Sequence, residues 1–204
     1  MRKEIPPNAN SLIMSMRSLG YSLNNAVADI IDNSISAKAT KIDIICSWDN
    51  QEPFVEIKDN GIGMTSEELE EAMRLGSKNP LHERDKEDLG RFGLGLKTAS
   101  FSQAKKLIVK TKQNENTYAA IWDLDLIEKE NKWFMDIEKL DGKNAFKEKG
   151  TTIRWEKIDT LEKKDKTNAQ EYFESVTSQL IKHISLVFHS STNVRVYYLP
   201  IIQM

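Results

Sequence analysis

The 204-residue chain, with 39% hydrophobic and 29% charged residues, has the length and composition of a globular protein with one sizeable domain, or with one domain and the start of another. Its formal net charge of -2 gives no basic field, so charge alone offers no argument for binding nucleic acid. The single cysteine, Cys46, excludes an intrachain disulfide framework, and the sequence shows neither a signal-peptide pattern nor an apolar run of ~18 residues, so we expect a cytoplasmic protein that does not span a membrane.

Hydrophobic periodicity predicts the elements of the first half of the chain. In order, we expect a helix, a longer helix, two strands and a short helix at 11–19, 22–37, 41–48, 54–59 and 65–75. The long helix begins at Ser22, a suitable N-cap, and its apolar stripe is formed by Leu23, Val27, Ile30, Ile31 and Ile35. Residues 76–90 are charged and aperiodic, so we expect a loop there.

Strands dominate the second half of the chain. A helix is expected directly after the glycines that end at Gly95. It is followed by four strands, a helix and a last strand at 105–112, 117–125, 132–139, 150–157, 167–188 and 193–200. Because several neighbouring strands are joined by short turns, we expect an α/β sandwich of the α+β class with a mixed, mostly antiparallel sheet.

One face of the 22–37 helix carries polar residues that can do chemistry. Asp29 and Asn33 are four residues apart and Ser36 is three further along, so their side chains project from the same face. A carboxylate and a carboxamide one turn apart offer the hard oxygen ligands that Mg²⁺ prefers, and the carboxylate could orient or deprotonate a water. Taken alone, the pattern fits a solvated helix face equally well.

The stretch KDNGIGM (58–64) ends a strand on an acid and continues through two glycines. Gly61 and Gly63 would let the backbone approach a flat ligand without interference from a Cβ. Asp59, at the strand end, could accept a hydrogen bond from an amino group such as N6 of adenine. The alternative is a plain Asn-Gly turn, because this dipeptide is a strong hairpin signal.

The stretch GRFGLGLKTAS (90–100) has the glycines of a phosphate loop but not its lysine position. Gly90 and Gly95 have the P-loop separation, yet Lys97 comes one residue too late for that motif. With Gly93 included, the spacing is G-x-x-G-x-G, which also differs from the Rossmann G-x-G-x-x-G. The backbone N–H groups of a glycine-rich turn that opens a helix still make an anion site, to which Lys97 could add a charge.

In their order along the chain, these motifs resemble those of the GHKL ATPase superfamily. The acid-x-x-x-Asn helix, D-x-G-x-G, G-x-x-G-x-G and the strand sequence GTTIRW span about 22–155 and are similar to motifs of gyrase-type topoisomerases, Hsp90-type chaperones, MutL-type repair proteins, histidine kinases and MORC proteins. The lead-in RSLGYS and the helix that follows look most like bacterial MORC-like ATPases. The resemblance implies the Bergerat fold, in which ATP lies between helices and sheet under a lid.

The resemblance implies a role for each motif residue. Asn33 looks like the Mg²⁺ ligand, and Asp59 looks like the carboxylate that reads adenine, with Thr151 of GTTIRW sharing its hydrogen bonds. Asp29 stands where hydrolytic members usually carry a glutamate as general base, so its shorter side chain predicts slow turnover. Asp32, the other nearby acid, points about 100° away from Asn33 on an ideal helix. The remaining cofactor-binding residues that the resemblance implies are Gly61, Gly63, Met64, Ser77, Lys78, Gly90, Phe92, Gly93, Leu94, Gly95 and Lys97.

The implied organisation is a lead-in at 1–21, an ATP-binding domain at 22–190 with its lid at about 76–90, and a C-terminal strand at 191–204 that could begin a second domain. We expect ATP and Mg²⁺ as cofactors, a nucleotide-dependent homodimer within a larger machine, and contact with nucleic acid only through parts outside this chain. Two alternatives stay open at this point. One is a nucleotide sensor that does not hydrolyse ATP, and the other is a histidine-kinase catalytic domain, although nothing in the sequence resembles its phosphoacceptor helix.

Overall fold

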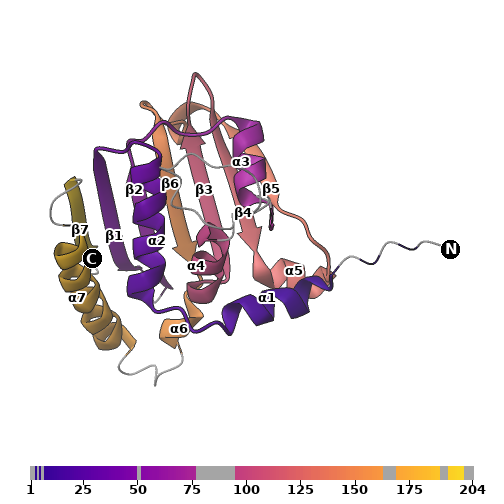
Figure 1. The fold of residues 1–204 in the computed structure, drawn as a ribbon, viewed down its shortest axis with the longest axis horizontal. Coiled ribbons are helices and arrows are strands. Elements are labelled where there is room, and N and C mark those ends of the chain that lie inside the picture. Colours follow the sequence, from indigo (N-terminus) through magenta and orange to yellow (C-terminus); the bar gives the residue numbers. More distant parts are fainter. Residues whose placement is uncertain are drawn as a thin grey trace.

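The computed structural model consists of two layers, a sheet and the helices packed on one of its faces (Figure 1). It describes residues 3, 5, 7–49, 52–76, 95–162, 169–188 and 193–199. Within these residues seven strands form one sheet in the order β5-β4-β3-β6-β2-β1-β7. The strands are β1 (Lys41–Asp49), β2 (Glu52–Asp59), β3 (Lys106–Lys112), β4 (Thr117–Asp123), β5 (Asp136–Leu140), β6 (Gly150–Glu156) and β7 (Asn193–Leu199).

The sheet is antiparallel at every neighbouring pair except β1 and β7, which run parallel. This confirms the predicted α+β fold with a mixed, mostly antiparallel sheet. The register places Asp59, the last residue of β2, opposite Ile42 of β1 on one side and opposite Thr151 of β6 on the other. Two motifs that lie far apart in the sequence therefore meet at one end of the sheet.

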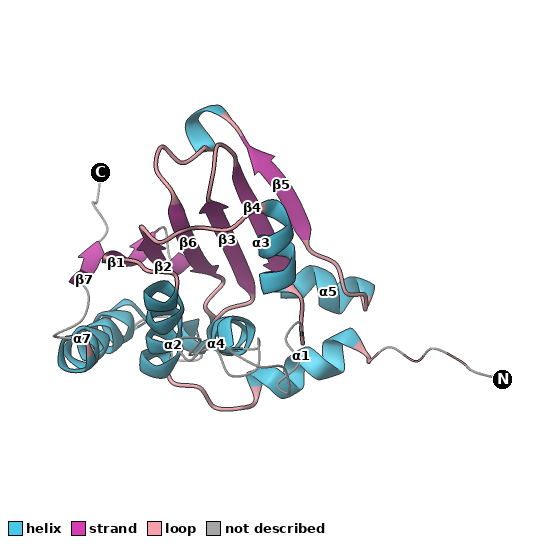
Figure 2. Cartoon of the chain, turned by 45° about the horizontal axis from the view of Figure 1, so that its top comes forward, coloured by secondary structure: helices cyan, strands magenta, loops and turns pink. Residues whose placement is uncertain are grey.

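The helices α2, α4 and α7 lie in a row on the same side of the sheet (Figure 2). None of the described helices is long and apolar enough to cross a membrane. A short 3₁₀ turn, Gly142–Asn144, precedes β6. The helices are α1 (Ala9–Arg17), α2 (Leu23–Ser36), α3 (Ser66–Met73), α4 (Gly95–Gln103), α5 (Leu124–Glu130), α6 (Asp159–Glu162) and α7 (Ala169–Val187).

Helix α2 begins where the sequence predicts, because the Ser22 side chain accepts the backbone N–H of Asn25. Its buried residues are Ala26, Val27, Ile30, Ile31 and Ser34. Ile35, which the apolar pattern placed in the buried stripe, is only half-buried. Ser34 thus brings a hydroxyl into the buried face of α2, next to the end of β2.

Two expected strands extend by two residues or more into segments that are not strands. The strand predicted at 117–125 ends at Asp123, because the side chain of Asp123 caps helix α5, which was not predicted from the sequence. The strand predicted at 132–139 begins only at Asp136. Its first apolar residues, such as Trp133, pack against the hydrophobic core from irregular backbone. Alternating apolar residues therefore indicated burial correctly but not strand conformation.

The face of the sheet opposite the helices carries ion pairs between strands. Arg154 Nη1 lies 3.2 Å from Glu56 Oε2, and its guanidinium lies 3.6 Å from the centre of the Phe54 ring. On β1, Asp43 accepts a hydrogen bond from Arg195 at 2.9 Å. Because side chains alternate along a strand, these residues point away from Asp59 and the helix layer.

Candidate nucleotide site

Asp59 is the centre of a buried hydrogen-bond network between α2 and the sheet. Its Oδ1 accepts the backbone N–H groups of Gly61 at 2.8 Å and of Thr151 at 3.3 Å, and its Oδ2 accepts the Ser34 hydroxyl at 3.1 Å. Asp59 is 7% exposed, and this burial raises its pKa above the ordinary value, although the three hydrogen bonds act in the opposite direction. An ionised carboxylate can accept about four hydrogen bonds, so the three bonds from the described residues leave one acceptor position unused.

A chain of hydroxyl groups extends this network across the sheet. Thr111 Oγ1 on β3 lies 3.1 Å from Thr151 Oγ1 on β6, accepts the N–H of Met64 at 2.9 Å and lies 3.2 Å from the carbonyl oxygen of Gly150. The network joins the loop after β2 to the ends of two further strands. Asp59, Thr151 and Met64, which the resemblance assigned to one site, are therefore brought together.

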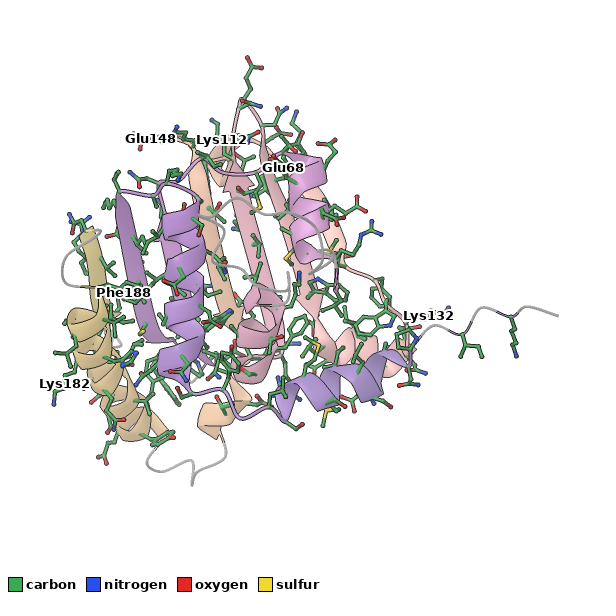
Figure 3. The ribbon with its side chains drawn as sticks, in the orientation of Figure 1. Glu68, Lys112, Lys132, Glu148, Lys182 and Phe188 are labelled. Carbon is green, nitrogen blue, oxygen red and sulfur yellow. The ribbon has the colours of Figure 1, made fainter. Side chains whose placement is uncertain are left out.

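The loop after β2 leads into α3 rather than into a paired strand, so the Asn-Gly pair is not a hairpin turn. Gly63 has φ +71°, and a Cβ there would lie 2.0 Å from the carbonyl oxygen of Lys112, which Figure 3 shows at this end of the sheet. A Cβ at Gly61 would lie 2.7 Å from the carbonyl oxygen of Ala37. The packing of the protein itself thus requires both glycines, and their contact with a ligand stays a prediction.

The polar face of α2 holds Asp29 and Asn33, both half-buried. The Tyr21 hydroxyl donates to Asp29 Oδ2 at 2.9 Å. Asn33 makes no side-chain hydrogen bond with the described residues, so its amide oxygen is available to a ligand there. The pKa of Asp32 is raised, first by burial and then by the charge of Asp29. Ser36 Oγ is buried and has no hydrogen-bond partner among the described residues.

Helix α4 begins at Gly95, and its Lys97 is 1% exposed. The Lys97 ammonium donates to the carbonyl oxygen of Ala72, near the end of α3, at 2.8 Å. Lys97 therefore links the start of α4 to the end of α3, and its contact with phosphate stays a prediction. Six further predicted site residues lie outside the described part of the chain: Ser77, Lys78, Gly90, Phe92, Gly93 and Leu94.

Three residues that the structure adds to the site were not predicted from the sequence, namely Tyr21, Ser34 and Thr111. Ser34 left a readable signal, because it lies three and four residues after Ile31 and Ile30 and so falls on the apolar face of the helix. Thr111 follows the alternation of the buried residues on β3. Nothing in the local sequence indicates the contact between Tyr21 and Asp29.

Comparison with known proteins places these motifs in one family. Residues 21–160 match the family model described as histidine kinase-, DNA gyrase B-, and HSP90-like ATPase. The chain is 32% identical over 90 residues to ATPase morc-1 of Caenorhabditis elegans, covering 44% of this chain and 10% of that protein. It is 33% identical over 92 residues to the DNA mismatch repair protein MutL of Rickettsia prowazekii, covering 45% of this chain and 15% of that protein.

A third relative is the chaperone protein HtpG of Helicobacter pylori, with 33% identity over 106 residues, 47% of this chain and 17% of that protein. Each match thus spans less than a fifth of the relative's own length. The family model, in contrast, covers α2, the loop after β2 and strand β6, which together hold the Asp59 network. Because this model matches more than half of the chain, the chain belongs to the family of histidine kinase-, DNA gyrase B- and HSP90-like ATPases.

Proposed function

We propose that this chain is a Mg²⁺-dependent ATPase module that binds ATP at the Asp59 network and hydrolyses it slowly. The observation that carries the proposal is the buried carboxyl of Asp59, which Ser34, Gly61 and Thr151 hold in one orientation. Its remaining acceptor position suits the N6 amino group of adenine. We further propose that closure of the predicted lid on nucleotide drives association of two copies within a larger machine.

The phosphate end of the site would lie at α2 and the start of α4, which pack against each other. Mg²⁺ takes hard oxygen ligands and is commonly held by one or two protein groups together with waters and substrate phosphates. The amide oxygen of Asn33 fits this requirement, since it has no side-chain partner among the described residues. Such an ion supplies positive charge to the phosphates. The backbone N–H groups at the start of α4, from Gly95 on, would add to that charge.

Asp29 is the proposed general base. Its carboxylate would take a proton from water while the water oxygen bonds to the γ-phosphorus, and the bond from that phosphorus to the bridging oxygen breaks, leaving its electron pair on ADP. Because an aspartate side chain is one CH₂ shorter than a glutamate, the water is less well placed, and ~1 Å of misplacement costs ~10²-fold in rate. Slow turnover is therefore expected.

Phosphate release from ATP, with and without Mg²⁺, tests this proposal, with Asp29→Asn as the diagnostic variant. We expect slow, Mg²⁺-dependent release that the variant abolishes, while ATP binding, followed by calorimetry, is kept. The control is Asp43→Asn, which changes an aspartate on the opposite face of the sheet and should release phosphate like the wild type. Unchanged turnover in Asp29→Asn would remove Asp29 from the role of base.

A nucleotide sensor that binds ATP without hydrolysing it is the second candidate. The aspartate at position 29, where the resemblance implies a glutamate, is the observation that favours it. The same experiment separates the two functions: a sensor binds ATP in calorimetry, and the wild-type protein itself releases no phosphate above the rate measured without protein.

A further inference from the structure

Tyr21 lies just before Ser22, the N-cap of α2, and its side chain contacts Asp29 further along the helix. Its hydroxyl donates to Asp29 Oδ2 at 2.9 Å, while its half-buried ring packs against the hydrophobic core. No other hydrogen bond to the Asp29 side chain occurs among the described residues. Oδ2 is therefore engaged by the protein, and Oδ1 is left for a ligand or a water.

The backbone at Tyr21 is itself fixed by α4. The side chain of Gln103, the last residue of α4 and 3% exposed, donates from Nε2 to the carbonyl oxygen of Tyr21 at 2.9 Å. Just before, Arg17 Nη1 donates to the carbonyl oxygens of Phe101 at 2.6 Å and Ala104 at 3.1 Å, and its Nη2 pairs with Asp159. The connection between α1 and α2 is thus tied to the end of the helix whose start faces the proposed phosphate site.

A hydrogen-bond partner can fix the orientation of an aspartate that acts as a base. The torsion that orients an aspartate carboxylate is broad, so the side chain alone does not select one orientation of its two oxygens. A hydrogen bond to a charged acceptor is stronger than one between neutral groups, and here it selects one oxygen. Because the arm of Asp29 is short, correct orientation of the remaining oxygen matters more than it would for a longer side chain.

We propose that Tyr21 is a positioning residue, which holds the Asp29 carboxylate so that Oδ1 faces the attacking water. This inference rests on the ATP hydrolysis proposed above. The pKa of Tyr21 is raised, chiefly by the hydrogen bond to Asp29 and also by burial and by the charge of Asp29, so the phenol stays protonated and remains a donor at neutral pH. Tyr21 itself does not touch the reacting atoms.

Kinetics of Tyr21→Phe test the proposal, because this change removes one hydroxyl and keeps the ring. We expect kcat to fall roughly tenfold, with the Kd for ATP unchanged to within about twofold. The matched control is Tyr198→Phe, which removes a 2.8 Å hydrogen bond to Glu174 between β7 and α7 and should leave kcat unchanged.

A second measurement does not depend on turnover. Titration of the tyrosines, followed by NMR of a label at Cζ, should show the pKa of Tyr21 falling in Asp29→Asn while that of Tyr198 stays where it is. An unchanged Tyr21 titration would overturn the proposal. So would a wild-type kcat in Tyr21→Phe, or an equal fall of kcat in Tyr21→Phe and in the Tyr198→Phe control, which would indicate a general structural effect. Absence of turnover in the wild type would overturn the proposed hydrolysis and this inference with it.

Discussion

Gly63→Ala should destabilise the protein strongly, because the alanine would adopt an unfavourable backbone conformation and its Cβ would also overlap with neighbouring backbone atoms. Gly63 has φ +71°, a conformation that costs a residue with a Cβ roughly 1 to 2 kcal/mol. The added Cβ would also lie 2.0 Å from the carbonyl oxygen and 2.5 Å from the carbonyl carbon of Lys112, which are backbone atoms of β3 and cannot rotate away. Relieving such an overlap by backbone movement costs about 1 to 3 kcal/mol more.

Together these terms predict a loss of about 2 to 5 kcal/mol in the free energy of unfolding, measured by urea denaturation. Gly20→Ala is the matched control, since Gly20 has φ +72° but no atom of the described residues within 4 Å of its added Cβ. It should lose only the roughly 1 to 2 kcal/mol of the conformational cost. Equal losses in the two variants would refute the reasoning that close packing against β3 makes Gly63 necessary.

Two further perturbations test other parts of the account. Burial raises the pKa of Asp59, so the protonated side chain stabilises the folded protein. This contribution is complete below the ordinary pKa of 3.8 and is lost as pH rises through the folded-state pKa. Urea denaturation should show the stability of the wild type falling relative to that of Asp59→Asn across this pH range, and a constant difference would contradict the shift. Arg17→Ala should lower the free energy of unfolding by roughly 2 to 4 kcal/mol, because it leaves partly buried carbonyl oxygens and Asp159 without their partner. The control Arg74→Ala, which removes an exposed ion pair, should lower it by at most about 1 kcal/mol. Similar losses in the two variants would argue against Arg17 as an anchor between the helices.

Local periodicity was sufficient to predict much of the fold. The apolar stripe and the Ser22 cap identified α2, and alternation identified β2 and β3, because each of these elements buries one face. Periodicity did not predict the end of β4, where the Asp123 side chain accepts a backbone N–H and caps α5. An alternating apolar pattern does not indicate such a cap. The buried face of α2 was also misread by one position, so Ser34 was overlooked as a donor to Asp59.

The candidate site is formed by contacts between segments that are far apart in the sequence. Local sequence patterns do not indicate these contacts, so they were not predicted. The spacing of Asp59, Gly61 and Gly63 suggested a ligand loop, but only the sheet register shows Asp59 opposite Thr151. The contact between Tyr21 and Asp29 depends on how the chain enters α2, and that path is fixed by Gln103, 82 residues away. The roles of these residues toward ATP and Mg²⁺ remain predictions.

The proposed site requires that Asp59 reads the amino group of adenine. Calorimetric titration of ATP and of inosine triphosphate, whose base has an oxygen in place of that amino group, tests it directly. We predict that the wild-type protein binds ATP more tightly than inosine triphosphate by roughly 10- to 100-fold, since a buried carboxyl would otherwise lose its partner, and that Asp59→Asn loses this preference while Asp43→Asn keeps it. Equal affinity of the wild-type protein for the two nucleotides, or an undiminished preference in Asp59→Asn, would contradict the account.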